Sequence, residues 1–187
     1  MTCAQGGSDC IPTKAYYDEK LLVGYRWYDQ HKVAPAFEFG FGLSYTSFEY
    51  QALRCTATTC TFTVENSGKV AGAEVAQLYL SFPARSDSLP LILALYDGTT
   101  LTVLCYHSAG EPPKQLKGVA KIKLAAGETR PVSLPLSQRD FSIWSEQMND
   151  WVVVVAGEFE VFVGSSSRDI RLHSVLKTRG DRHGPAF

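Results

Sequence analysis

The sequence has no apolar run long enough to cross a membrane and no cluster of lysine and arginine residues. A spanning helix needs about 20 consecutive apolar residues, and a polyanion is bound by a basic patch. With a formal net charge of -1, the 187-residue chain offers neither. We therefore expect no membrane segment and no nucleic-acid partner. The first residues lack the basic start and the apolar stretch of a secretory signal, so we expect no signal peptide in this chain.

The spacing that is typical of metal sites is absent as well. The five cysteines form no C-x-x-C pair and the four histidines are scattered, so we expect no metal, no cofactor and surface positions for the histidines. Cys55 and Cys60 are close in sequence, and their spacing fits either a disulfide across a short hairpin or two free buried thiols. The redox environment of the chain therefore stays open at this level.

From residue 47 onward, short runs of β-branched and aromatic residues alternate with turn residues, whereas helical periodicity is nearly absent. This pattern is typical of an all-β sandwich. An apolar content of 45% is enough to build a core. The expected strands cover residues 47–54, 59–65, 74–82, 117–124, 129–136, 151–155, 158–163 and 170–176.

Alternation along these strands predicts their core faces and some of their partners. The residues expected to share a face are Ala76, Leu78 and Leu80, on the core side, and Phe159, Val161 and Val163. Residues 117–124 and 129–136 are expected to pair as antiparallel neighbours, because Ala125-Ala126-Gly127-Glu128 supplies a turn between them. Residues 170–176 should add an edge strand, and residues 177–187 should form a flexible tail with nothing to bury.

Tryptophan side chains can serve two different purposes in such a domain. Trp27, Trp144 and Trp151 could stack on pyranose rings, because an aromatic face is a flat apolar platform, or they could pack in a core or between domains. We favour packing. Trp151 stands beside four valines and is expected to be a core residue.

Residues 16–41 differ in character from the rest, with eight aromatic residues interrupted by glycine and proline. We interpret them as an extended connecting segment. A lone sandwich could hardly cover so many rings, which indicates a surface that packs on another domain. Asp29 could pair with Arg26 and lock this segment. Other carboxylates near aromatic segments are expected in solvated or capping roles.

A more specific likeness is carried by Val23-Gly24-Tyr25-Arg26-Trp27-Tyr28-Asp29 and by Pro35-Ala36-Phe37-Glu38-Phe39-Gly40-Phe41-Gly42-Leu43-Ser44-Tyr45-Thr46. These stretches closely resemble the joint that leads into the last domain of family 3 glycoside hydrolases, with fungal secreted β-glucosidases as the most similar subgroup. The resemblance continues to about residue 172. It implies an immunoglobulin/fibronectin type III-like antiparallel β-sandwich with an extended N-terminal connector. The implied limits are 1–36 for the remnant of a preceding α/β domain and connector, 37–176 for the sandwich and 177–187 for the tail.

The same resemblance implies that this chain has a non-catalytic role. Retaining glycosidases need two carboxyl groups about 5 Å apart, and in family 3 these come from a barrel and a second domain that have no counterpart here. The chain is thus expected to be a non-catalytic module of an extracellular β-glucosidase that hydrolyses terminal β-D-glucosyl residues, with no catalytic residue and with residues 16–45 packed on the catalytic domains. A carbohydrate-binding module that holds β-glucan or oligosaccharide through exposed aromatics is the alternative. The expected interdomain packing residues are Tyr25, Arg26, Trp27, Tyr28, Phe37, Phe39 and Tyr45.

Residues 85–107 depart from the family pattern, because the sequence matches it smoothly when Ala84 is joined directly to Ser108. Two apolar runs flank Asp97-Gly98 within this segment, which predicts an extra hairpin with a type I′ turn. We interpret the segment as a translated, unspliced intron, and a genuine insertion is the alternative. Sequencing the spliced transcript distinguishes the two.

Overall fold

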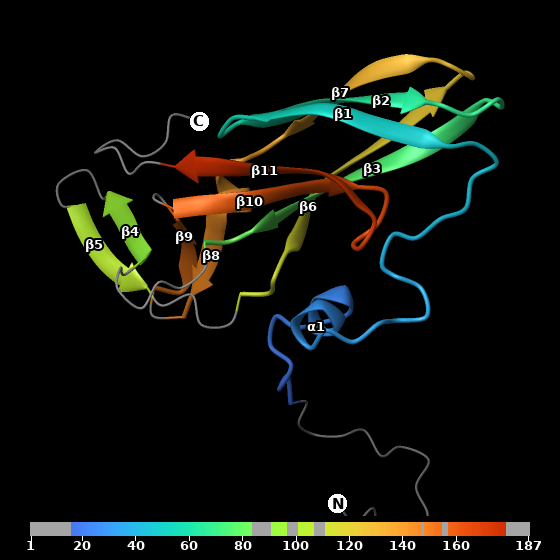
Figure 1. Ribbon diagram of the computed structural model, residues 1–187. Helices are drawn as coiled ribbons and strands as arrows, with labels where there is room; N and C mark the ends of the chain where they lie inside the picture. Colours follow the sequence, from blue (N-terminus) through green and yellow to red (C-terminus); the bar gives the residue numbers. More distant parts are fainter. Residues whose placement is uncertain are drawn as a thin grey trace, which may run out of the picture.

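The computed structural model describes residues 16–83, 111–146, 148–154 and 157–178, together with the backbone of residues 91–96 and 101–106. The regular secondary structure of the described residues is almost entirely β, as expected (Figure 1). Within the described residues, the helical elements are α1 (Tyr25–Gln30) and a short 3-10 helix, η1 (Gln138–Phe141).

Two antiparallel sheets form a sandwich, and two separate hairpins complete the β-structure (Figure 1). The three-stranded sheet has the order β1 (Phe48–Cys55), β2 (Thr59–Asn66), β7 (Thr129–Pro135). The four-stranded sheet has the order β11 (Ile170–Thr178), β10 (Gly157–Gly164), β3 (Gly72–Ser81), β6 (Gln115–Leu124). The hairpins are β4 (Leu91–Tyr96) with β5 (Leu101–Tyr106), and β8 (Ser142–Ser145) with β9 (Asp150–Val153).

The hydrophobic core lies between the two sheets and is built from alternate residues of their strands. The predicted core face of β3 is confirmed, because Ala76, Leu78 and Leu80 are all fully buried. The β10 residues Phe159, Val161 and Val163 share the same core. The opposite sheet contributes Phe62 and Val64 from β2 and Val132 and Leu134 from β7.

One predicted strand pairing is wrong, although both strands exist. Residues 117–124 and 129–136 do not pair with each other: β6 pairs with β3, so that Ala120 lies opposite Ala76, whereas β7 pairs with β2. The turn between them therefore crosses from one sheet to the other. It is closed by the Ala125 N–H, which donates to the Glu128 carboxylate at 2.7 Å, and by Gly127 with a φ of 75°. Alternation identifies a strand, but it does not identify the neighbour of that strand.

Trp151 does not lie in the core, which contradicts the expectation from its valine neighbours. Its side chain is 38% exposed, whereas Val152 and Val154 are buried, so the alternation of β9 directs the indole outward. There it stands opposite Trp144, with ring centroids 5.6 Å apart. The Arg139 guanidinium lies 3.3 Å from the Trp151 ring centroid and covers one face of the indole.

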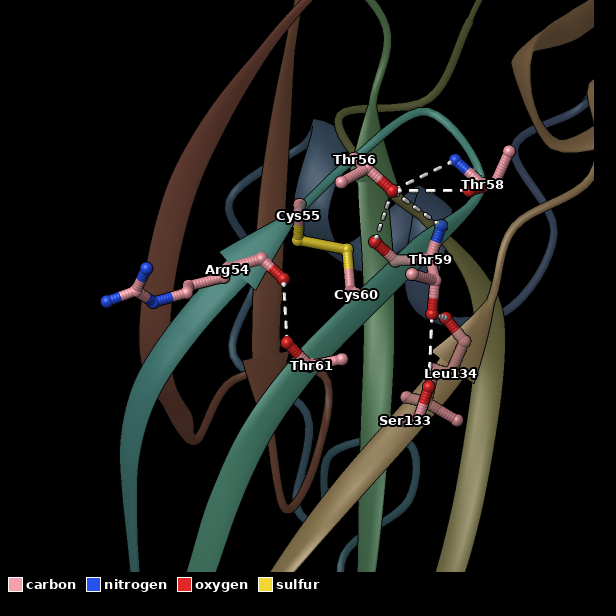
Figure 2. The surroundings of a disulfide bond; sticks show 9 residues. All are labelled: Arg54, Cys55, Thr56, Thr58, Thr59, Cys60, Thr61, Ser133 and Leu134. Atoms are coloured by element: carbon pink, nitrogen blue, oxygen red, sulfur yellow. Dashed lines mark hydrogen bonds between the residues drawn. A yellow bond between two sulfur atoms is a disulfide. The ribbon is translucent and has the colours of Figure 1, made fainter. Parts of the chain in front are cut away.

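The β1–β2 hairpin ends in a disulfide between Cys55 and Cys60 (Figure 2). Of the two alternatives for these cysteines, the structure has the disulfide. The hairpin loop is also held by Thr56, whose N–H donates to the Thr59 carbonyl at 2.8 Å and whose hydroxyl accepts from the Thr59 N–H at 3.2 Å. The Thr59 hydroxyl reaches Ser133 on β7 at 3.1 Å, so the hairpin end is tied to the next strand.

Other expectations have mixed outcomes. The backbone of 91–96 pairs antiparallel with that of 101–106, as expected for a hairpin, while the predicted turn at Asp97-Gly98 lies outside the described residues. Whether 85–107 is an intron or an insertion stays a prediction.

The edge position of β11 is confirmed, but the strand extends to Thr178, so the start of the expected tail at residue 177 is wrong. No helix in the described ranges is long and apolar enough to span a membrane.

Candidate docking surface

The segment expected to be an extended connector contains a short helix and is fixed to the sandwich. We refer to residues 16–45 as the connector. Its helix α1 has six residues, begins after Gly24 without a side-chain cap and buries none of its residues completely. The connector lies against the end of the four-stranded sheet where β10 turns into β11, before the chain enters β1 (Figure 1). This expectation of an extended segment was therefore wrong over residues 25–30.

Asp29 at the end of α1 is the main ionic anchor of the connector. Its carboxylate lies 2.5 Å from the Lys114 ammonium and 3.5 Å from Nε of Arg168, and the Asp29 side chain is only 9% exposed. The proposed partner Arg26 is wrong: the Arg26 guanidinium lies near the Tyr25 ring and donates to the Leu21 carbonyl at 3.5 Å. Two cations from distant parts of the chain thus hold one carboxylate of α1.

The β10–β11 turn supplies further hydrogen bonds to the connector. The Arg168 guanidinium donates to the Val33 carbonyl at 2.6 Å, and the Ser167 N–H donates to the Phe39 carbonyl at 2.8 Å. The Ser166 hydroxyl donates to the Glu38 carboxylate at 3.1 Å. Backbone carbonyls on both sides of residues 34–37 are therefore fixed, which holds this stretch in one position on the sheet.

Tyr25 seals the inner side of the connector against β3. Its ring stacks on Phe39 with centroids 4.8 Å apart and meets the buried ring of Tyr79 edge-on at 5.8 Å. The Tyr25 hydroxyl accepts a hydrogen bond from the Leu116 N–H at 2.8 Å. Offset-stacked and edge-to-face geometries are the favourable arrangements for aromatic pairs. The connector is thus a packed part of the domain along this inner side.

Because of this cover, the outer face of β3 is buried at Gln77 and Tyr79. The Tyr79 hydroxyl donates to Oε1 of Gln77 at 2.6 Å, and Nε2 of Gln77 donates to the Ser165 and Gly40 carbonyls at 2.5 and 3.2 Å. Burial raises the pKa of Tyr79 well above its usual value, and the nearby Tyr25 and Asp29 add to this effect. Tyr79 therefore stays a neutral hydrogen-bond donor.

The outer side of the connector carries many exposed apolar side chains. Tyr45 is 99% exposed, Leu43 is 92% exposed and Phe37 is 73% exposed. The exposed large apolar residues of the connector are Tyr16, Tyr17, Leu21, Val23, Trp27, Tyr28, Val33, Phe37, Phe39, Phe41, Leu43 and Tyr45. Phe37 and Phe41 lie together with ring centroids 5.4 Å apart. So many solvent-facing rings in one segment are unusual for a monomer and are typical of interaction surfaces.

The seven residues expected to pack between domains divide into two groups. Tyr25 faces inward onto β3, and Arg26 lies at its side. The exposed members are Trp27, Tyr28, Phe37, Phe39 and Tyr45. Sequence reasoning missed Lys114, Gln77 and Arg168, which position the connector. Nothing local in the sequence could have signalled them, because each lies at least 37 residues from its partner in the connector.

A hollow lies between α1 and the following stretch of the connector. Its volume is about 350 Å³. Its walls include Tyr25, Tyr28, Phe37 and Phe39, and its base includes the ion pair of Asp29 with Arg168. The hollow therefore combines aromatic walls with a charge-balanced base.

Carboxylates with raised pKa values do not form a catalytic pair in the described residues. Burial raises the pKa of Glu74, which accepts a hydrogen bond from the Tyr50 hydroxyl at 2.7 Å, and it raises the pKa of Glu111, which accepts from Gln115 at 2.6 Å. Glu74 lies near the start of β3 and Glu111 near its end, because Leu80 of β3 pairs with Gln115. A retaining glycosidase requires carboxyl groups only about 5 Å apart. Among the described side chains, no cluster of potential ligands could hold a metal ion.

Each tryptophan already has an aromatic or cationic neighbour. The planes of Trp144 and Trp151 are inclined by 62°, and Arg139 covers one face of Trp151. Trp27 stacks on His31 with centroids 4.3 Å apart. These arrangements do not favour the carbohydrate-binding alternative.

Comparisons with known proteins agree with this architecture. The chain matches the family described as "Fibronectin type III-like domain" over residues 74–167. It is 39% identical over 179 residues to "Probable beta-glucosidase L" of Emericella nidulans, which covers 83% of this chain and 21% of that protein. The crystal structure of β-glucosidase D2-BGL from Chaetomella raphigera aligns with 37% identity and a TM-score of 0.74, over 90% of this chain and 24% of that one. The β-D-glucoside glucohydrolase of Trichoderma reesei aligns with 33% identity and a TM-score of 0.70, over 96% and 24%.

The fold and its connector define a fibronectin type III-like β-sandwich. The chain belongs to the fibronectin type III-like domain family, and its relatives are family 3 β-glucosidases. It spans between a fifth and a quarter of the length of these relatives.

Proposed function

We propose that this chain is a non-catalytic module of a family 3 β-glucosidase and that it stabilises the catalytic domains by packing against them through the connector. The observation that carries the proposal is the combination of a fixed inner side and an exposed aromatic outer side in the same segment. A surface that is held rigid before binding loses little conformational entropy when a partner covers it. Exposed rings on such a surface are typical anchors of interfaces.

The relatives support the choice of partner. Their names and titles describe β-glucosidases, and this chain aligns with only 21% to 24% of the lengths of the three described above. The proposed partner is therefore the remaining, catalytic part of such an enzyme, which would hydrolyse β-D-glucosides. We also propose an extracellular location for the whole enzyme, for which the Cys55–Cys60 disulfide is supporting evidence, because disulfides persist in oxidising compartments.

A chimeric enzyme tests the packing role. This chain would replace the corresponding part of the Trichoderma reesei β-D-glucoside glucohydrolase, and the activity and melting temperature of the chimera would be compared with those of the parent. We expect the chimera to be active, because the connector offers the surface on which the catalytic part packs. An inactive, aggregated chimera would contradict the proposed role.

A pair of matched variants in the chimera identifies the surface. Changing Phe37, Leu43 and Tyr45 to serine removes exposed apolar groups from the connector, and changing Val75, Val119 and Val175 to serine removes exposed apolar groups from the strands. We expect the connector variant to shorten the half-life of activity on heating by roughly tenfold, as for loss of an interface anchor, and the strand variant to leave it unchanged. Equal effects would contradict docking through the connector.

A further inference from the structure

The hollow beside α1 is open to solvent but has fixed walls. Phe39 is stacked on Tyr25, and the Phe39 carbonyl accepts from the Ser167 N–H, so this wall cannot move independently of the sheet. On the other side, Asp29 is bound to Lys114 and Arg168. Phe37, which also lines the hollow, is largely exposed and packs on Phe41. The hollow is therefore formed before any partner arrives.

Charge balance at the base indicates what kind of group fits. Asp29 is the acidic residue of the lining and Arg168 the basic one, and they pair with each other at 3.5 Å. The other lining side chains that matter here, Tyr25, Tyr28 and Phe37, present aromatic surface. A charged group entering this site would lose its hydration without finding an unpaired opposite charge, which is costly. A neutral apolar group is favoured instead.

The volume leaves room for such a group. At about 350 Å³ the hollow is at the small end of the range of roughly 300–1,000 Å³ that is typical of ligand sites. This is more space than one side chain occupies, so an aromatic or large aliphatic side chain can enter the hollow with its backbone outside. Interfaces commonly place one such anchor residue in a preformed pocket near their centre.

The occupant is indicated by the relatives. The Trichoderma reesei alignment covers 96% of this chain, so the connector is included in the similarity, and it leaves about three quarters of that enzyme outside the aligned part. We propose that the hollow is a socket for a single aromatic or large aliphatic side chain carried by the catalytic part of a family 3 β-glucosidase. This inference rests on the proposed function and adds a defined anchor point to it.

Small analogues of side chains test the socket in the isolated chain. Toluene and indole, which represent phenylalanine and tryptophan, would be titrated while amide chemical shifts are followed by NMR. The amides of Gly24, Phe37 and Arg168 should shift, and this response should disappear in Ala36→Trp, because residue 36 lines the hollow and its new side chain would fill it. Val175→Trp, a matched change on an exposed strand position, should leave the response intact. The absence of shifts, or equal shifts in Ala36→Trp, would overturn the socket.

The same two variants in the chimeric enzyme test the occupant. We expect Ala36→Trp to reduce the half-life of activity on heating by roughly tenfold, because the anchor side chain is displaced, and Val175→Trp to have no effect. Both isolated variants should keep the far-UV circular dichroism and the urea midpoint of the unmodified chain, since both positions are exposed. If the unmodified chimera is active and Ala36→Trp is equally resistant to heat, the socket is wrong while the packing role stands. If the unmodified chimera is inactive, the packing role is contradicted and the occupant of the socket with it.

Discussion

At the scale of single residues, Tyr50 and Glu74 form a hydrogen bond that joins the two sheets. Tyr50 belongs to β1 in the three-stranded sheet and Glu74 to β3 in the four-stranded sheet, and the hydroxyl donates to the carboxylate at 2.7 Å. Burial raises the pKa of Glu74, while the hydrogen bond from Tyr50 and the charge of Arg171 act in the opposite direction. The hydrogen bond between the two sheets therefore depends on a carboxyl group, that of Glu74, whose protonation changes with pH.

The raised pKa of Glu74 predicts how stability depends on pH. The folded state binds the proton of Glu74 more tightly than the unfolded state, so the contribution of Glu74 to stability is largest at low pH and falls as the pH rises through the raised pKa. In urea unfolding between pH 4 and pH 8, the free energy of unfolding of the unmodified chain should thus fall relative to that of Glu74→Gln. A difference that grows with pH would contradict this account.

Removal of the Tyr50 hydroxyl has a separate expected result. Tyr50→Phe leaves a half-buried carboxylate without its donor, which should lower the free energy of unfolding by about 1–3 kcal/mol at neutral pH. Urea unfolding measures this loss. Tyr45→Phe is the matched control, because Tyr45 is almost fully exposed, and it should change the stability very little. Similar losses in both variants would show that the Tyr50–Glu74 contact does not stabilise the fold.

At the scale of elements, Asp29 decides whether the connector stays in place. Asp29→Asn removes the charge that holds Lys114 and Arg168 but leaves the sandwich core untouched. We expect amide hydrogen exchange over residues 25–33 to accelerate by roughly tenfold, while β2 and β10 exchange as before. Asp18→Asn, an exposed change in the same segment, should leave exchange unaltered. Unchanged exchange in Asp29→Asn would contradict the anchoring role.

The disulfide at the end of the β1–β2 hairpin is expected to stabilise the fold. Cys55 and Cys60 close a loop of very few residues, so the loss of loop entropy in the unfolded chain is small and the disulfide should contribute about 2 kcal/mol. Urea unfolding with and without a thiol reductant measures the difference. A reduced chain as stable as the oxidised one would indicate that the threonine and β7 contacts alone hold the hairpin end.

The elements could be predicted from the sequence to a large extent, and so could the pairing of β4 with β5 across a short turn, but the partners of strands that are distant in the sequence could not. Alternation located β3 and β10 and their core faces, because a buried strand face imposes a period of two. The helix α1 was missed because six residues with no cap and no fully buried position leave little periodicity to detect. The pairing of β6 with β3, and that of Asp29 with Lys114 and Arg168, depend on contacts between distant parts of the chain.

At the scale of the whole molecule, the connector gives the sandwich two very different ends. At one end, the connector is tied to the β10–β11 turn and presents exposed aromatic side chains and the hollow to solvent. The β4–β5 and β8–β9 hairpins lie away from α1 (Figure 1). The aromatic composition of residues 16–41 indicated more rings than the domain could cover, and many of them are exposed; their packing on another domain stays a prediction. The composition could not predict the hollow, whose base comes from residues 29 and 168.

Amide hydrogen exchange, compared between the isolated chain and the chimeric enzyme, tests the central claim most directly. If the connector packs on the catalytic part, residues 35–45 should exchange markedly more slowly in the chimera, whereas the exposed edge strand β11 should exchange at the same rate in both. Equal exchange of residues 35–45 in the two proteins would contradict docking through the connector.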